Sequence, residues 1–128
     1  MWVYDQSDGR FYHQINNADM GSCTFVAQGY SGKAWAKNNP KAENAKSMGP
    51  IPKGMWKIGA AYDSKNVGPR AIILEPMEGT RTYGRSAFRI HGDSIRNPGT
   101  ASRGCIILPR NVRERIIKSS DKILRVVE

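Results

Sequence analysis

Short apolar runs separated by glycine, proline and asparagine constrain the fold of this chain more than any other feature. The runs are rich in β-branched and aromatic residues, which favours β-strands over helices. Ser7-Asp8-Gly9 is a turn signal between the first two runs and predicts an opening hairpin. We therefore expect a mostly β fold, a compact β-sandwich. Its strands are predicted at residues 2–4, 11–15, 24–27, 55–58, 71–74, 87–90, 105–108 and 123–127.

One or two short helices are expected beside these strands. Asn39 is a suitable N-cap and Pro40 suits the first helical position, so residues 39–46 are predicted to be helical. Pro109 is predicted to begin a second helix through residue 118, with its arginines pointing outward. The apolar face of this helix would consist of Val112, Ile116 and Ile117.

The length of the chain predicts a single domain over residues 1–128, because 128 residues can enclose a core but not two. No apolar run approaches the ~20 residues of a membrane span, so membrane insertion is not expected. The first residues lack the basic start and apolar stretch of a signal peptide. A cell-wall substrate would therefore be reached either by a route that does not read a signal peptide or through a leader that the sequence no longer contains.

Two reactive side chains lie at predicted strand ends and form a candidate catalytic site. Cys105 follows Gly104 at the start of one strand, and His91 precedes Gly92 at the end of another. A thiol attacks as thiolate, so it needs a base or a positive charge nearby; His91 is the candidate base. Gly104 keeps the sulfur accessible, and the N–H groups of Gly104 and Cys105 could face a developing oxyanion. Arg103 adds a positive charge that favours thiolate and could hold a substrate carboxylate.

Each of these residues alone also has a purely structural explanation. A cysteine beside isoleucines is usually a small core residue, and a lone histidine is usually a satisfied polar group. Cys23 and Cys105 could form a disulfide in an oxidising compartment, although we expect a packed thiol at Cys23. His13 alternates like an exposed strand residue, and we expect it on the surface. No ligand spacing predicts a metal site, and no cofactor is expected.

The net charge of +9 is concentrated in the half of the chain that holds the candidate site. Residues 65–128 contain 13 basic and 6 acidic side chains, whereas residues 1–64 contain 7 and 5. This favours an anionic substrate, or simply a solvated cationic surface. Nucleic-acid binding is the electrostatic alternative, but no zinc spacing, helix-turn-helix pattern or aromatic-basic platform accompanies the charge. We therefore expect no nucleic-acid partner.

A family resemblance follows from these motifs. His-Gly, a loop, and Ser-x-Gly-Cys followed by aliphatic residues resemble the catalytic domain of the L,D-transpeptidases, which act on peptidoglycan stem peptides. Further segments resemble the small antibacterial effectors of type VI secretion, and the similarity covers roughly residues 1–127. These segments are Tyr30-Ser31-Gly32, Asn38-Asn39-Pro40 and Gly49-Pro50-Ile51-Pro52-Lys53-Gly54, with Trp56 and Ile58.

The resemblance implies an L,D-carboxypeptidase or L,D-transpeptidase that acts on stem tetrapeptides through a thioester. Cys105 would be the nucleophile and His91 the base, oriented by a backbone carbonyl near Gly92 or, as a lesser alternative, by Asp93. Ser102, Arg103 and Asp93 are the candidate substrate-binding residues. The resemblance also implies a secreted monomer that acts in the periplasm of a target bacterium, and a cognate immunity protein in the producing cell.

Two positions depart from the pattern of that family. Arg103 stands where a second histidine commonly precedes Gly-Cys, which affects substrate orientation and the balance between transfer and hydrolysis. Ile107 stands where many members have a polar residue, which removes a supporting hydrogen bond. The competing hypothesis from another functional class is a basic wall-binding module without catalysis, which would keep its full effect after Cys105→Ala.

Overall fold

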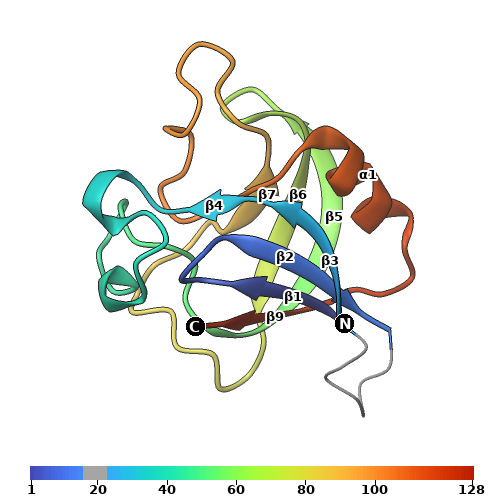
Figure 1. Ribbon diagram of the computed structural model, residues 1–128, viewed down its shortest axis with the longest axis horizontal. Helices are drawn as coiled ribbons and strands as arrows, with labels where there is room; N and C mark the ends of the chain where they lie inside the picture. The colour runs from blue at the N-terminus through green and yellow to red at the C-terminus, as the bar shows by residue number, and fades with distance from the viewer. Residues whose placement is uncertain (16–22) are drawn as a thin grey trace.

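A computed structural model describes residues 1–15 and 23–128 of the chain (Figure 1). Strands dominate, with two short 3-10 helices and one α-helix among the described residues. The mostly β class predicted from the apolar runs is thus confirmed. In chain order the elements are β1 (Trp2–Asp5), β2 (Arg10–Gln14), β3 (Cys23–Gln28), β4 (Tyr30–Ser31), η2 (Ala34–Ala36), η3 (Pro40–Ala42), β5 (Gly54–Ser64), β6 (Gly68–Pro76), β7 (Arg89–His91), β8 (Ile106–Ile107), α1 (Arg110–Lys118) and β9 (Ile123–Val127).

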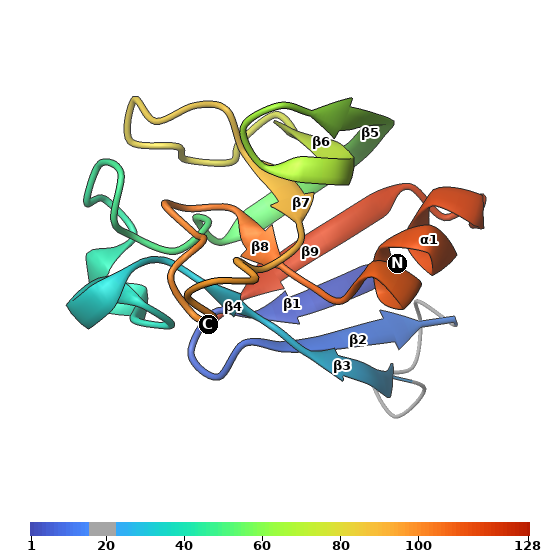
Figure 2. The ribbon, with the colours of Figure 1, turned by 90° about the horizontal axis from the view of Figure 1, so that it is seen from above.

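The nine described strands belong to one hydrogen-bonded sheet in the order β3-β2-β1-β9-β5-β6-β7-β8-β4. The strands at the two ends of this order, β3 and β4, are consecutive in the chain and are separated by Gly29 alone. The sheet therefore curls, and Figure 2 shows β1–β3 on one side of the molecule and β5–β7 on the other. The two layers are parts of one continuous sheet.

Large apolar side chains from both layers fill the space inside the curl. In β9, Leu124 and Val126 are buried while Arg125 between them is exposed, as the period of two in a strand requires. Trp56 of β5 packs edge-to-face on Phe88, with ring centroids 4.9 Å apart. The other fully buried core residues include Trp2, Tyr4, Phe11, Ile51, Ile72, Ile90, Ile106, Ile116 and Leu124.

Helix α1 packs on this core. The prediction that all of its arginines point outward was wrong for one of them. Val112 and Ile116 are buried as expected, but Arg113 is buried beside them, with only 4% of its surface exposed. Its guanidinium donates to the backbone carbonyls of Leu108 (2.8 Å), Arg70 (3.2 Å) and Pro69 (3.4 Å). Burial is tolerated because these carbonyls satisfy the donors while the stem covers apolar surface.

The helix predicted over residues 39–46 is much shorter in the structure. Asn39 caps it as predicted, since its side chain accepts a hydrogen bond from the Lys41 N–H at 3.1 Å, but η3 ends at Ala42. The next carboxylate, Glu43, points into the protein, where it accepts hydrogen bonds from Gln6 (2.7 Å) and Tyr83 (2.6 Å). Ser47 has a φ of 59°, which a continuing helix does not allow.

Strands β5 and β6 extend well beyond the predicted segments and form one long hairpin, because their outer residues pair with each other and need no apolar face. Strand β4 was not predicted, since two residues carry no periodicity. Within the described part of the chain, no helix has the length and apolar character needed to cross a membrane.

Candidate functional site

His91 is the last residue of β7, and Cys105 directly precedes β8, which pairs with β7 in parallel (Figure 2). The register pairs Ile90 with Ile106 and His91 with Ile107, so Cys105 lies beside Arg89. The parallel register thus brings His91 and Cys105 onto neighbouring segments of the chain, with Cys105 in the bend just before the paired residues of β8. They are offset by two residues, or about 7 Å along the strand direction. Figure 2 shows β7 and β8 next to each other, joined by a long loop.

The His91 imidazole is buried and oriented by the backbone. Only 2% of the residue is exposed, and Nδ1 lies 2.8 Å from the carbonyl oxygen of Gly92. If Nδ1 carries the proton and donates to this carbonyl, Nε2 is left as the acceptor. Burial lowers the pKa of His91, and the charge of Arg113 lowers it further, against the opposing effects of the Gly92 carbonyl and Asp93. The imidazole is therefore neutral near pH 7, as a general base must be.

Gly92 has a second role, which is steric. A Cβ atom at this position would lie 2.8 Å from Nη1 and 3.2 Å from Nη2 of the buried Arg113. Only a glycine lets the guanidinium come this close to the backbone after His91. Arg113 thus supports the histidine strand from the helix side.

Asp93 fastens the loop after His91 and does not hydrogen-bond the imidazole. Its carboxylate accepts hydrogen bonds from the Tyr30 hydroxyl (2.5 Å), the Ser94 N–H (2.8 Å) and the Gly99 N–H (3.1 Å). Burial alone would raise its pKa, but these hydrogen bonds outweigh it and hold the pKa of Asp93 below its usual value. Burial and the bond to Asp93 raise the pKa of Tyr30 to about 12. The Gly92 carbonyl, rather than Asp93, orients His91.

Ser102 sets the turn that presents Cys105. It is fully buried, and its hydroxyl donates to the Cys105 carbonyl at 2.6 Å. The same oxygen accepts the N–H groups of Gly32 (2.8 Å) and Gly104 (3.1 Å). Ser102 was expected to contact substrate, but the structure places it beneath the turn, with its hydroxyl saturated by the backbone. The Gly104 N–H, a candidate oxyanion donor, is engaged in the same cluster.

Gly104 is required by its backbone and its surroundings. Its φ of 136° is open to glycine alone, and a Cβ atom there would collide with Nη2 of Arg85. That arginine is a clamp that sequence reasoning did not single out. Its Nη1 donates to the carbonyls of Glu43 (2.6 Å) and Pro50 (2.9 Å), and its Nη2 donates to those of Gly49 (2.8 Å) and Arg103 (3.3 Å).

The Cys105 thiol is half-buried and approaches the Ala87 carbonyl, with Sγ 3.8 Å from the oxygen. Burial raises the pKa of Cys105, while a hydrogen bond from the Arg89 backbone and the charges of Arg89 and Arg85 oppose this rise. The net effect keeps the resting group as a thiol, so a thiolate would need a base. The charges that oppose the rise come from Arg89 and Arg85, and not from Arg103 as the sequence suggested.

Two hollows adjoin the pair. A groove of about 930 Å³ is lined by His91, Tyr30, Asp93 and residues of the 92–101 loop. A smaller hollow of about 320 Å³ is lined by Cys105 together with residues 46–47, 84–88 and 103–104. In this structure the candidate base and the candidate nucleophile thus open onto neighbouring but separate depressions.

A family model named the Tlde1 domain matches residues 26–128, from β3 to the end of the chain. The chain belongs to the Tlde1 domain family. This is a family of type VI secretion effectors with L,D-transpeptidase-like activity, which implies secretion and action in a target cell. No curated protein and no solved structure matches the chain significantly. The matched region of the Tlde1 domain contains both candidate reactive residues and the arginine clamp.

The Tyr30-Ser31-Gly32 segment of the Tlde1 domain fastens the loop between the two candidate reactive residues. Tyr30 binds Asp93, the Ser31 hydroxyl donates to the Gly104 carbonyl at 3.2 Å, and the Gly32 N–H donates to Ser102. The Tyr30 hydroxyl also accepts the Ala101 N–H at 2.9 Å. In the sequence this segment was notable only as part of a family resemblance. The pairing of β4 with β8 shows its structural role, which is to hold the 92–105 loop in place.

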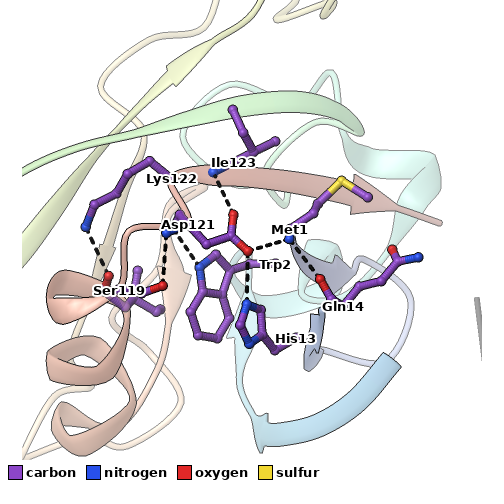
Figure 3. A network of polar contacts seen from close by, with 9 residues as sticks. Met1, Trp2, His13, Gln14, Ser119, Asp121, Lys122 and Ile123 are labelled. Carbon is purple, nitrogen blue, oxygen red and sulfur yellow. Dashed lines mark hydrogen bonds and ion pairs between the residues drawn. The ribbon is translucent and has the colours of Figure 1, made fainter. Parts of the chain in front are cut away.

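The remaining predicted residues lie apart from this pair. Cys23 and Cys105 are both free thiols, so the disulfide alternative is not realised. His13 is mostly buried, contrary to its predicted exposure: it stacks on Trp2 with ring centroids 3.8 Å apart, and its Nε2 lies 2.9 Å from Oδ2 of Asp121 (Figure 3). Its packing against Trp2 explains the burial. Among residues 1–15 and 23–128, no group of three or more His, Cys, Asp or Glu side chains is arranged to hold a metal ion.

Proposed function

We propose that this Tlde1 domain is a cysteine-dependent peptidoglycan enzyme that acts on stem tetrapeptides through a thioester. Family membership supports the substrate class, because it implies L,D-transpeptidase-like activity. The observation that supports the mechanism is the register of β7 and β8, which brings the end of β7 at His91 next to the start of β8, directly after Cys105. A neutral, backbone-oriented imidazole beside a half-buried thiol is the arrangement that nucleophilic catalysis needs.

In this mechanism Nε2 of His91 takes the proton of the Cys105 thiol as sulfur attacks the carbonyl carbon between diaminopimelate and the terminal D-alanine. Collapse of the tetrahedral intermediate breaks the C–N bond, and the imidazolium returns the proton to the departing amine of D-alanine. The product is a thioester on Cys105. Water resolves it in the L,D-carboxypeptidase reaction, whereas the amine of a D-amino acid or of another stem peptide resolves it in exchange or cross-linking.

The unliganded site would have to tighten for this reaction. The sulfur now lies against Ala87, and His91 opens onto the other hollow. Catalytic hydrogen bonds are often long or misaligned before substrate binds, and a substrate that spans both hollows would bring the two groups together. An oxyanion contact from Gly104 would also require its N–H to be shared with the Ser102 hydroxyl.

The biological setting belongs to the same proposal. The protein would act as a monomer in the periplasm of a target bacterium after type VI secretion. Depletion of tetrapeptide donors would weaken the target wall. The producing cell would carry an immunity protein that covers the candidate site.

Muropeptide analysis tests this function. Diaminopimelate-type peptidoglycan is incubated with wild type, with Cys105→Ala and with the matched control Cys23→Ala, each with and without a free D-amino acid. We expect wild type and Cys23→Ala to convert tetrapeptides to tripeptides or to exchange the terminal residue. Cys105→Ala should do neither. Unchanged muropeptides with folded wild-type protein would contradict the proposal.

A non-catalytic wall-binding module is the second candidate, and the raised pKa of the Cys105 thiol together with its separate hollow favours it. Under that function Cys105→Ala would keep full toxicity when expressed in the periplasm. Loss of toxicity with unchanged folding would support the enzyme instead.

A further inference from the structure

The hollow beside Cys105 has an unusual concentration of positive charge. Lys46, Arg85 and Arg103 all line it, together with Ser47 and Ser86, and none of the described residues that form its wall is acidic. These residues come from three separate segments of the chain, which the fold brings together around one thiol. The groove on the His91 side also has three arginines in its wall, Arg96, Arg110 and Arg113, but Asp93 is among its lining residues as well.

The three cations have different roles. Arg85 already donates to four backbone carbonyls, so it contributes charge and holds the hollow in shape. Lys46 and Arg103 are exposed side chains whose donors can turn toward a ligand in the hollow. Together they provide a site for a carboxylate, which charged donors bind more strongly than neutral ones do.

The size of an amino-acid residue links this site to the attacked bond. One residue spans at most about 3.6 Å, so the carboxylate of a C-terminal residue lies only that far from the carbonyl carbon that precedes it. When Cys105 attacks that carbon, the carboxylate lies within about one residue's length of the reacting carbon, and the hollow that Cys105 lines is within that reach. If the peptide continued, a neutral amide would occupy the same place and leave the cations unpaired.

We propose that this hollow is a carboxylate subsite that binds the free C-terminus of the residue to be released. This rests on the proposed function and deepens it. The subsite restricts the enzyme to the last residue of a stem peptide, and Lys46 and Arg103 are its specificity-determining residues. Peptides whose terminal carboxylate is blocked are poor substrates for the same reason.

The test compares a disaccharide tetrapeptide with the same molecule carrying a C-terminal amide. Release of the terminal residue is measured with wild type, with the Lys46→Gln/Arg103→Gln double variant and with Arg125→Gln. Arg125 is exposed on β9 and does not line the hollow, so its variant controls for lost charge. We expect wild type and Arg125→Gln to prefer the free carboxylate by about 10- to 100-fold in kcat/KM, the range expected of hydrogen bonds to a charged group.

The double variant should lose most of this preference through a higher KM for the free acid, with little change toward the amide. A preference that persists in the double variant, or that is missing in wild type, would overturn the subsite. The thermal unfolding of the double variant should match that of wild type, since the Lys46 and Arg103 side chains are both exposed.

A binding measurement separates failure of the subsite from failure of the proposed function. Calorimetry with folded Cys105→Ala protein measures the affinity for the tetrapeptide and for its amide without any turnover. A tighter complex with the free acid, lost when Lys46→Gln and Arg103→Gln are added, supports the subsite even if wild type turns over neither substrate. Equal affinity for acid and amide would overturn the subsite even if wild type is active.

Discussion

Replacing the buried Arg113 by methionine should destabilise the protein and disturb His91 together. Methionine keeps the apolar stem but removes the donors that serve three backbone carbonyls. The bond to the Leu108 carbonyl is buried, and leaving that oxygen unpaired costs about 1–3 kcal/mol. The bonds to Arg70 and Pro69 are partly buried, and we assign about 0.5–1 kcal/mol to each. Relief from burying a charge offsets part of this, which leaves a loss of about 2–4 kcal/mol.

Urea unfolding followed by tryptophan fluorescence measures this loss. With an m value of about 2 kcal/mol per molar urea, the midpoint should fall by about 1–2 M. Arg110→Met is the matched control, because Arg110 is exposed on the same helix and should change stability by no more than about 0.5 kcal/mol. Equal urea midpoints for the two variants would show that the buried guanidinium of Arg113 does not stabilise the fold.

The same variant has an electrostatic consequence for His91. The Arg113 charge adds to the larger effect of burial in lowering the pKa of His91, so its removal should raise that pKa toward the ordinary value. A base with a higher pKa becomes protonated at a higher pH. As the pH is lowered, any rate that needs neutral His91 should therefore begin to fall at a higher pH in Arg113→Met than in wild type. NMR titration of the His91 ring measures the shift directly. A titration unchanged from wild type would show that the guanidinium charge does not reach the imidazole.

Three further variants test other parts of the site. Ser102→Ala should cost about 2–3 kcal/mol in urea unfolding, because the buried Gly104 N–H loses its acceptor; a loss under 0.5 kcal/mol would contradict this. Tyr30→Phe removes a hydrogen bond from the Asp93 carboxylate, so amide hydrogen exchange in residues 92–101 should accelerate while β5 and β6 stay protected; uniform protection would show that the loop does not depend on this bond. His91→Ala should slow iodoacetamide alkylation of the candidate nucleophile near neutral pH. In wild type, the part of the rate that depends on His91 should be lost only below pH 6.5, because burial lowers the pKa of His91 from that value. An unchanged rate would rule out His91 as the activating base.

The local pattern of the sequence was enough to predict the strands but not their arrangement. The apolar runs gave the β class and placed His91 and Cys105 at the ends of two strands, because alternation and turn residues act over a few positions. The pairing of β4 with β8 depends on Gly29 and on contacts across most of the chain. No local signal encodes such a pairing.

The supporting residues of the site escaped prediction for the same reason. Arg85 is one of many arginines in the sequence, and only the folded chain shows that its donors meet four carbonyls. Arg113 was predicted to point outward because charged residues are rarely buried. It is buried because three backbone carbonyls accept hydrogen bonds from its guanidinium. Ser102 was predicted to bind substrate, whereas its hydroxyl turns inward and bonds the backbone.

Detection of the acyl-enzyme tests the central claim most directly. Wild-type protein is mixed with disaccharide tetrapeptide, quenched with acid after short times, digested and mapped by mass spectrometry. The account predicts a transient adduct on Cys105 with the mass of the disaccharide tripeptide acyl group, formed with the release of one D-alanine. It also predicts that the adduct is absent from Cys23 and decays faster when a D-amino acid is added. Release of D-alanine with no adduct on Cys105, or with the same yield from Cys105→Ala, would contradict the account.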